Sequence, residues 1–266
     1  MWKWGITLDL GPLHDLKDVL PESTLEALLN PAAKSIGTAV GGLCDLIFFP
    51  LHKLGIYTEQ KLKEYSDKIK QKTDDIPVEN RDASKLNLVF KALEDSKYQI
   101  NEEELQEAFA NLIASTIDNR VNKFITPRFS TALAELGPED AQLINIIAKQ
   151  PNFQMVCGDL IVMYKKDGSS KPISDLWMST IDSAVFSMPD SVDTLDALKI
   201  ISVTRNEWFL ADAYQTNYKI MENTLKAKYP MSNLKENEEV QLRKGCLRTT
   251  TFGKHFISCV TGNKMK

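Results

Sequence analysis

The sequence predicts a mainly α-helical fold: a helical bundle with a small β-hairpin, winged-helix-like part toward the C-terminal end. Three observations predict it. Apolar residues recur at three- and four-residue spacing in most segments before residue 150. Residues that favour helix starts, such as Asn and Pro, stand where several of these segments begin. Apolar and polar residues alternate over residues 240–250, as is typical of β-strands.

The chain is expected to have three parts. Residues 1–75 form an N-terminal helical segment, which contains an apolar stretch rich in small residues at 32–56 and a polar helix at 58–74. Residues 76–150 form a central helical domain, and residues 151–266 form a winged-helix-like C-terminal domain. A length of 266 residues agrees with a small number of domains, since a domain has about 150 residues.

The helices of the first two parts have recognisable starts. A thin apolar stripe predicts a surface helix from Thr58 to Asp75, and a second helix is expected over Ser84–Leu93. Asn101 is expected to cap the next helix, with Glu104 at the capping-box position. Two further helices are expected to begin at prolines, Pro127 and Pro138.

The C-terminal part mixes strands and helices. Leu160–Tyr164 is expected to be a short strand, and Leu195–Ile201 begins as a helix and continues toward an extended segment. Val240–Thr250 predicts a β-hairpin that turns at Lys244–Gly245. Thr251–Cys259 then resembles a closing helix.

Charge and cysteine content restrict the class of protein. The net charge is −4, which disfavours broad nucleic-acid binding because such binding needs clustered positive charge. The four cysteines are scattered and form no C-x-x-C pair, so a reduced, cytoplasmic protein is expected. The first residues lack the features of a secretory signal.

The stretch at 32–56 is the most unusual segment. Small residues at 33, 37 and 41 form one stripe, a spacing that lets two helices approach closely. Asp45 and Pro50 interrupt it, so it falls short of a membrane span. Two interpretations stay open: a buried core helix, or an amphipathic segment that enters a membrane interface after activation. The candidate membrane or self-association residues are Ala33, Ile36, Gly37, Val40, Gly41, Leu43, Leu46, Ile47, Phe48 and Phe49.

A second candidate site is basic. Arg243, Lys244, Arg248 and Lys254 could contact phosphates if Gly245 were the tip of a wing. The alternative is a solvated hairpin whose charges block edge-to-edge aggregation. The alternative is favoured, because the rest of the chain is acidic.

No enzyme site is expected. The histidines have no metal-ligand spacing, and Gly253-Lys254-His255 lacks the hydroxyl residue of a phosphate loop. The acidic residues 102–104 and 107 are better explained by the positive end of a helix dipole than by catalysis. Cys157 and Cys259 lie among apolar residues and are expected in the core. The sequence therefore predicts no metal, no cofactor and no catalytic residue.

Four stretches carry a family resemblance. They are Leu28–Gly37, Glu103–Ala114, Pro127–Phe129 with Leu136–Ala141, and Leu247–Cys259. In this order they resemble the abortive infection alpha family, which is catalogued as a domain of unknown function. The second stretch is the most specific, and together they cover roughly residues 28 to 260. The segment Asn152–Ser191 is less similar to the family.

The resemblance implies a role in phage resistance and assigns no reaction. An abortive-infection protein must stop the host cell, and membrane damage requires no active site. The expectation is an anti-phage protein that senses a phage protein trigger, self-associates and moves from the cytoplasm to inner-membrane lipid. The alternative is a nucleic-acid-binding or regulatory winged-helix-like module in a defence locus, although the acidic charge makes nucleic acid the less favoured partner.

Overall fold

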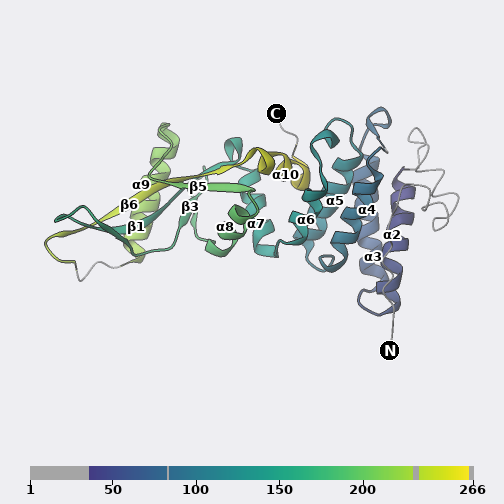
Figure 1. The fold of residues 1–266 in the computed structure, drawn as a ribbon, viewed down its shortest axis with the longest axis horizontal. Helices are drawn as coiled ribbons and strands as arrows, with labels where there is room; N and C mark the ends of the chain where they lie inside the picture. Colours follow the sequence, from purple (N-terminus) through teal and green to yellow (C-terminus); the bar gives the residue numbers. More distant parts are fainter. Residues whose placement is uncertain (1–35, 83, 230–233, 264–266) are drawn as a thin grey trace. The chain divides into compact units, whose positions relative to one another are not determined.

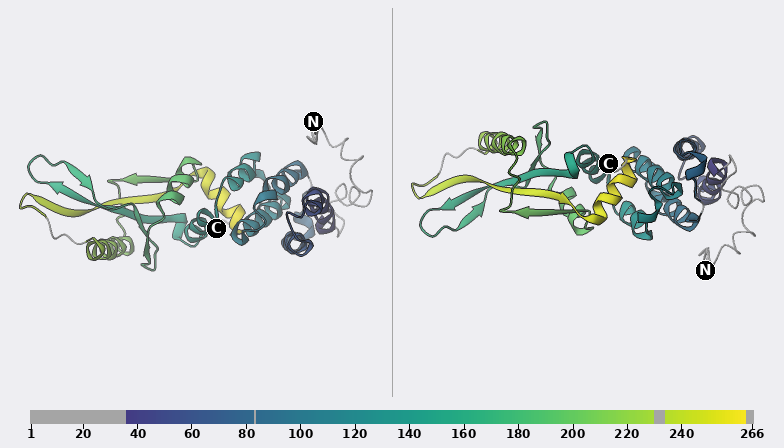
Figure 2. Two further views of the ribbon diagram at one scale, coloured as in Figure 1. Left: turned by 90° about the horizontal axis from the view of Figure 1, so that it is seen from below. Right: turned by 90° about the horizontal axis from the view of Figure 1, so that it is seen from above.

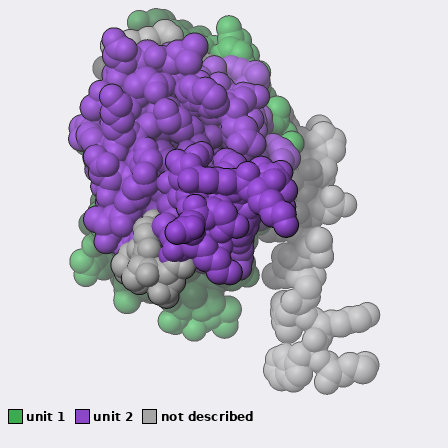
Figure 3. Space-filling view, turned by 90° about the vertical axis from the view of Figure 1, so that its left-hand side faces the viewer, with its two compact units in different colours: residues 1–134 green, residues 135–266 purple. Residues whose placement is uncertain are grey.

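The computed structural model describes residues 36–82, 84–229 and 234–263 (Figure 1). The chain divides into two compact units, Met1–Ala134 and Glu135–Lys266 (Figure 3). Ala33, one of the candidate membrane residues, lies outside the described residues, and the helix labels of Figure 1 begin at α2. Each unit is described by itself.

The first unit is helical over its described residues. Its longer helices and its 3-10 turns follow one another in this order: α2 (Ile36–Lys53), α3 (Glu59–Asp74), η2 (Val78–Asn80), α4 (Leu86–Asp95), η3 (Ser96–Tyr98), α5 (Glu103–Ile117), η4 (Asn122–Phe124) and α6 (Pro127–Ala134). The expected helices at 58–74, at 84–93 and from Pro127 are therefore confirmed. Helix α3 begins after Thr58, whose hydroxyl accepts a hydrogen bond from the Lys61 N–H at 3.2 Å.

The expected cap of α5 is wrong by one residue. The N-cap residue is Glu102, not Asn101, and its side chain makes no capping hydrogen bond. Glu102 has extended backbone angles (φ −90°, ψ 112°), so the helix starts only at Glu103. Glu103 and Glu104 then occupy the first turn, where their charge favours the positive end of the helix dipole.

The core of the first unit lies between α4, α5 and α6, which pack on one another. Each helix contributes large side chains at helical spacing that are almost completely buried, and burying each of them contributes about 1.5–3 kcal/mol. They are Val89, Phe90, Leu93, Leu105, Phe109, Leu112, Ile113, Phe129 and Leu133. Helix α3 packs on α5, and α2 packs mainly on α3.

The second unit combines helices with an antiparallel sheet. Its elements are α7 (Pro138–Ala148), η5 (Pro151–Phe153), β1 (Gln154–Tyr164), β2 (Ser170–Pro172), β3 (Trp177–Ser179), β4 (Val185–Phe186), α8 (Pro189–Ala197), β5 (Ile201–Arg205), α9 (Asp212–Lys228), β6 (Glu238–Thr249) and α10 (Thr251–Thr261). Pro138 opens α7 as expected. The expected strand, helix and closing helix near residues 160, 195 and 251 are also present.

The sheet is larger than the sequence predicts. The described residues form a six-stranded sheet in the order β4-β3-β1-β6-β5, and β2 also pairs with β1. The protein is therefore mixed α and β, with a β-rich C-terminal unit, rather than a mainly helical bundle with one small hairpin. The central pair is β1 and β6, whose antiparallel register runs from Gln154↔Arg248 to Tyr164↔Glu238.

The predicted hairpin at Val240–Thr250 is wrong, because this segment lies within one continuous strand. Gly245 is not a turn residue. A Cβ atom at this position would lie 2.7 Å from the Thr204 carbonyl oxygen and 3.1 Å from the Cys157 sulfur. The glycine therefore allows the close packing of β6 between its neighbours β1 and β5.

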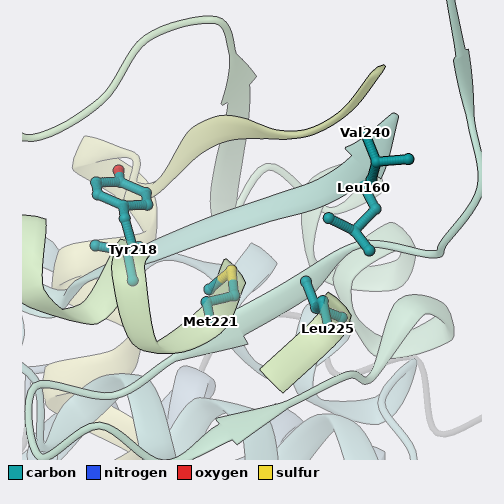
Figure 4. Close-up of a cluster of buried hydrophobic side chains, with 6 residues drawn as sticks. Leu160, Tyr218, Met221, Leu225 and Val240 are labelled. Carbon is teal, nitrogen blue, oxygen red and sulfur yellow. The ribbon is translucent and has the colours of Figure 1, made fainter. Parts of the chain in front are cut away.

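Helix α9 covers one face of the sheet. Tyr218, Met221 and Leu225 of α9 face Leu160 of β1 and Val240 of β6 (Figure 4). Alternate residues of the strands point to this face, and the intervening residues point to the face near α8. The Tyr218 hydroxyl donates a hydrogen bond to the Gly245 carbonyl at 2.7 Å, which satisfies the one polar group that Tyr218 brings into the core.

The stretch Leu247–Cys259 contains a tight junction between β6 and α10. The Thr250 hydroxyl caps α10 by accepting from the Gly253 N–H at 2.9 Å, and it donates to the Lys199 carbonyl at 2.5 Å. A Cβ atom at Gly253 would lie 1.8 Å from the Ile200 carbonyl oxygen. Close backbone packing therefore explains the glycine in Gly253-Lys254-His255.

We predict that Gly253→Ala strongly destabilises the protein. The added methyl group overlaps main-chain atoms, which cannot move aside as a flexible side chain would, so the loss should reach about 3 kcal/mol or more. Urea unfolding measures this loss. Lys254→Ala on the same helix is the control, because Lys254 is exposed, and it should stay within about 0.5 kcal/mol of the wild type. Equal stabilities of the two variants would contradict the account.

Candidate functional site

The apolar face of α2 is buried in the first unit. The side chains of Val40, Leu43, Ile47 and Phe48 are at most 5% exposed. The Phe48 ring meets the Tyr65 ring of α3 edge to face, with centroids 5.8 Å apart. These five residues are called the α2–α3 contact below. The side chains of Ile36, Gly37, Leu46 and Phe49 lie outside the described residues.

The α2–α3 contact contains a poorly satisfied polar group. Tyr65 is completely buried, and its hydroxyl lies beside Ser96, whose own hydroxyl donates to the Leu93 carbonyl at 2.8 Å. The Tyr65 hydroxyl makes no well-formed hydrogen bond. Burial raises the pKa of Tyr65, so the hydroxyl stays neutral. An unpaired buried hydroxyl costs about 1–3 kcal/mol, which weakens the packing around it.

At Gly41, the described member of the small-residue stripe, packing is less tight than the spacing suggests. At Gly41, a Cβ atom would meet the Ser66 hydroxyl oxygen of α3 at 3.7 Å, an ordinary van der Waals contact. An alanine therefore fits at this position. Gly41 faces α3, but the closeness of the two helices does not require the glycine.

A cavity of about 310 Å³ opens beside the α2–α3 contact. Its α2 side is formed by Cys44, Phe48 and His52, and its α3 side is formed by polar residues together with Leu62. Most of α3 is polar, and its buried residues are Tyr65, Ile69 and Thr73. The apolar face of α2 is thus covered by α3, which has few apolar side chains.

Helix α3 is held more firmly on its other side. Glu107 of α5 forms ion pairs with Lys68 at 3.2 Å and with Lys72, both from α3. Desolvation raises the pKa of Glu107, but the hydrogen bonds and charges of Lys72 and Lys68 outweigh it and lower the pKa overall. Glu107 therefore belongs to a structural link between α3 and α5.

The four basic candidates do not form one cluster. Arg243 and Lys244 are neighbours on β6 and so point to opposite faces of the sheet. Lys244 donates to the Gln215 side chain at 3.2 Å and lies over the Tyr218 ring. The remaining two candidates are an ion-paired residue on β6, Arg248, and an exposed residue on α10, Lys254.

Arg243 is bound by a buried carboxylate that sequence reasoning missed. Asp159 of β1 is 2% exposed and lies directly across from Arg243 in the strand register. The two side chains form a bidentate ion pair at 2.9 and 2.5 Å. The hydrogen bonds from Asp159 raise the pKa of Arg243. An Asp among the apolar residues 155–162 was the signal that could have indicated this pair.

This ion pair lines a polar cavity of about 480 Å³ between the sheet and α8. Arg205 of β5 and two carboxylates of α8, Asp193 and Asp196, also line it. The lining therefore carries charges of both signs, and Asp159 is already neutralised by Arg243. This arrangement suits the binding of a polar group.

Metal and thiol chemistry find little support among the described residues. They include no group of three or more His, Cys, Asp or Glu side chains that could hold a metal ion. Four buried cysteines take part in no disulfide bond: Cys44, Cys157, Cys246 and Cys259. Burial raises the pKa of Cys157 to about 12, so its thiol stays protonated and unreactive. The expectation that Cys157 and Cys259 lie in the core is confirmed.

The two units together match a known family. The model of the family described as abortive infection alpha matches residues 57–260, which is most of the chain, and the protein belongs to this family. The suspected family is therefore confirmed, and with it a general association with abortive infection and phage defence. No curated protein and no solved structure gives a significant match. Within the described residues, no helix is both long and apolar enough to cross a membrane.

We predict that Arg243→Met destabilises the protein by about 3–5 kcal/mol, because it leaves the Asp159 carboxylate buried without a partner. The double variant Asp159→Leu, Arg243→Met removes both charges and should regain most of this loss. Urea unfolding of the two single variants and the double variant measures their coupling. Additive effects would contradict a direct ion pair.

A pH dependence follows from Glu107. Its pKa is lowered in the folded protein, so the ion pairs contribute stability above the unfolded pKa near 4.5, and this stability is lost as the pH falls through the folded pKa. Glu107→Gln should therefore lower the melting temperature at pH 7 and have less effect below about pH 4. A difference between the two proteins that stays constant with pH would contradict this assignment.

Proposed function

We propose that the protein is an abortive-infection effector that recognises a phage component through protein contacts, self-associates and damages the inner membrane with α2. In this proposal the protein is cytoplasmic before infection, and α2 is held against α3. The phage component favours the state in which α2 is released. The released apolar face then enters the membrane interface, and the infected cell stops growing.

The observation that carries this proposal is the composition of the α2–α3 contact. Four apolar side chains of α2 are buried mainly against a helix that is mostly polar, and one of them, Phe48, contacts the ring of Tyr65, whose hydroxyl makes no well-formed hydrogen bond. Exposing these four side chains to water costs roughly 6–12 kcal/mol, at about 1.5–3 kcal/mol for each. Burial of the same side chains in lipid would offset much of this cost. Release of α2 therefore becomes favourable only where its apolar face can bind a membrane or a partner.

The amphipathic character of α2 sets the kind of membrane contact. The helix has 18 residues, contains Pro50 and ends with His52 and Lys53. A helix of this kind suits a position in the plane of the interface, with its apolar face in the acyl region and its basic end near anionic headgroups. The proposal therefore involves insertion into one leaflet rather than a span.

The ion pairs of Glu107 support a separate movement of α2. Lys68 and Lys72 of α3 are bound to Glu107 of α5, which links these two helices independently of α2. Helix α3 can therefore remain with α5 while α2 leaves. The sites of phage recognition are expected on the surface of the protein, and the charged cavity near α8 is one such place.

The second hypothesis, nucleic-acid binding through the C-terminal unit, has weaker support. Arg243 and Arg248 are bound by Asp159 and Glu207, and Lys244 lies beside aromatic rings. A phosphate would have to compete with these contacts. Charge is also distributed over both faces of the sheet, so no continuous basic strip follows β6.

The proposal predicts that the strength of the α2–α3 contact controls membrane damage. Tyr65→Phe removes the unpaired hydroxyl, so it should raise the melting temperature and weaken phage defence. Leu62→Ala loosens the cover of α2 without changing α2 itself, so it should depolarise cells before infection. Membrane potential and phage yield are measured in the same cells, with and without infection.

A matched control separates release of α2 from general instability. Leu225→Ala creates a cavity in the core of the second unit and should cost about 2–5 kcal/mol. It should not depolarise uninfected cells. The proposal is wrong if Leu62→Ala and Leu225→Ala behave alike, or if wild-type cells stop growing on infection with an unchanged membrane potential. Equal phage yields with and without the gene would contradict the defence role itself.

A further inference from the structure

Strand β5 leaves one edge of the sheet open. It is the last strand in the order β4-β3-β1-β6-β5 and pairs with β6 alone. In both views of Figure 2, β5 lies at the rim of the sheet, and no described segment covers its outer side. Its sequence, Ile-Ser-Val-Thr-Arg, contains no Pro or Lys, the residues with which many proteins block an exposed edge.

The hydrogen-bond pattern shows which main-chain groups face outward. The Asn206 N–H donates to the Lys244 carbonyl at 2.9 Å, and the Thr250 N–H donates to the Ile200 carbonyl at 3.1 Å. Even-numbered residues of this segment therefore direct their main-chain groups toward β6. The N–H and C=O groups of Val203, and of the residues two before and two after it, point to the open edge.

The open edge is complementary to itself. If two copies pair antiparallel about Val203, each Val203 lies opposite the other, and Ile201 of one copy lies opposite Arg205 of the second. All three pairs are then hydrogen-bonding pairs, because the outward-facing residues are the odd-numbered ones. A two-fold axis perpendicular to the sheet relates the copies, and the two sheets join into one.

The charges at the ends of β5 favour the same arrangement. Lys199 precedes the strand and Glu207 follows it; each also has an ion-pair partner in its own chain, Asp196 and Arg248, yet their side chains remain 64% and 61% exposed. Antiparallel pairing about Val203 brings Lys199 of each copy to the end where Glu207 of the other copy lies. Trp208, which is 47% exposed, follows Glu207 at this end and offers an aromatic surface to the arriving lysine.

We infer that β5 is a self-association edge, through which two copies of this chain form a symmetric dimer with a continuous sheet. The occupant is a second copy because the register and the end charges of β5 match β5 itself. This edge would be the surface for the self-association step of the proposed function. The biological role of the dimer rests on that proposed function, whereas the dimer itself does not. It does not depend on the release of α2.

Sedimentation velocity of the purified full-length protein over a concentration series tests the inference. The wild type should dimerise. Val203→Pro removes an outward-facing N–H, so it should abolish the dimer while the pairing with β6 stays intact. Val203→Thr keeps the N–H and the branched side chain, and it should dimerise like the wild type. Circular dichroism and melting temperature show that the variants are folded.

A charge swap tests the orientation of the two copies. Lys199→Glu or Glu207→Lys alone places like charges together at both symmetric ends, so each should weaken the dimer by roughly five- to tenfold. The double variant restores opposite charges between the copies and should bind more tightly than either single variant. A monomeric wild type, a dimer that survives Val203→Pro in the folded protein, or single and double charge variants of equal affinity would each overturn the inference. These experiments involve no membrane. Failure of the dimer inference can therefore be told apart from failure of the proposal that α2 damages the membrane.

Discussion

The antiparallel ladder between β1 and β6 is the constraint on which the second unit depends. It pairs Gln154–Tyr164 with Glu238–Arg248 residue by residue, and all other strands except β4 join one of these two strands directly. One face of the ladder supplies the apolar side chains that α9 covers. The other face carries the Asp159–Arg243 pair and the charged cavity. Because side chains alternate along a strand, a shift of one residue would exchange the two faces. The ion pair and the close contacts of Gly158 and Gly245 oppose such a shift.

The first unit depends on a different balance. Helices α4, α5 and α6 share a core of large apolar side chains, whereas α2 is bound through one face to a polar helix. The ion pairs of Glu107 with Lys68 and Lys72 link α3 to α5. The ring of Tyr65, whose hydroxyl makes no well-formed hydrogen bond, contacts Phe48 of α2. A helix that is weakly covered next to a stable core is the kind of element that opens separately from the rest of a domain.

Sequence reasoning predicted the helices well and the sheet poorly, for physical reasons. Helix signals are local: Thr58, Pro127 and Pro138 mark starts that the structure confirms. Sheet pairing joins residues far apart in the chain, so the partner of Val240–Thr250 could not be found from alternation alone, and Gly245 was taken for a turn instead of a close contact between strands. Of the candidate residues, the structure brings Val40, Leu43, Ile47 and Phe48 together on one buried face, while the basic residues are separated because neighbours on a strand face opposite ways. The family was predictable because its motifs, such as Glu103–Ala114, are contiguous.

Amide hydrogen exchange of the purified protein tests the central claim most directly, because it reports the opening of each helix without the phage component. If α2 is held mainly by the α2–α3 contact, its amides should exchange through a local opening that leaves α5 and the β1–β6 ladder protected. Tyr65→Phe should slow the exchange of α2 and leave that of α5 unchanged. Exchange of α2 only together with α4 and α5, at the rate of global unfolding, would show that α2 is an integral part of the core and would contradict the account.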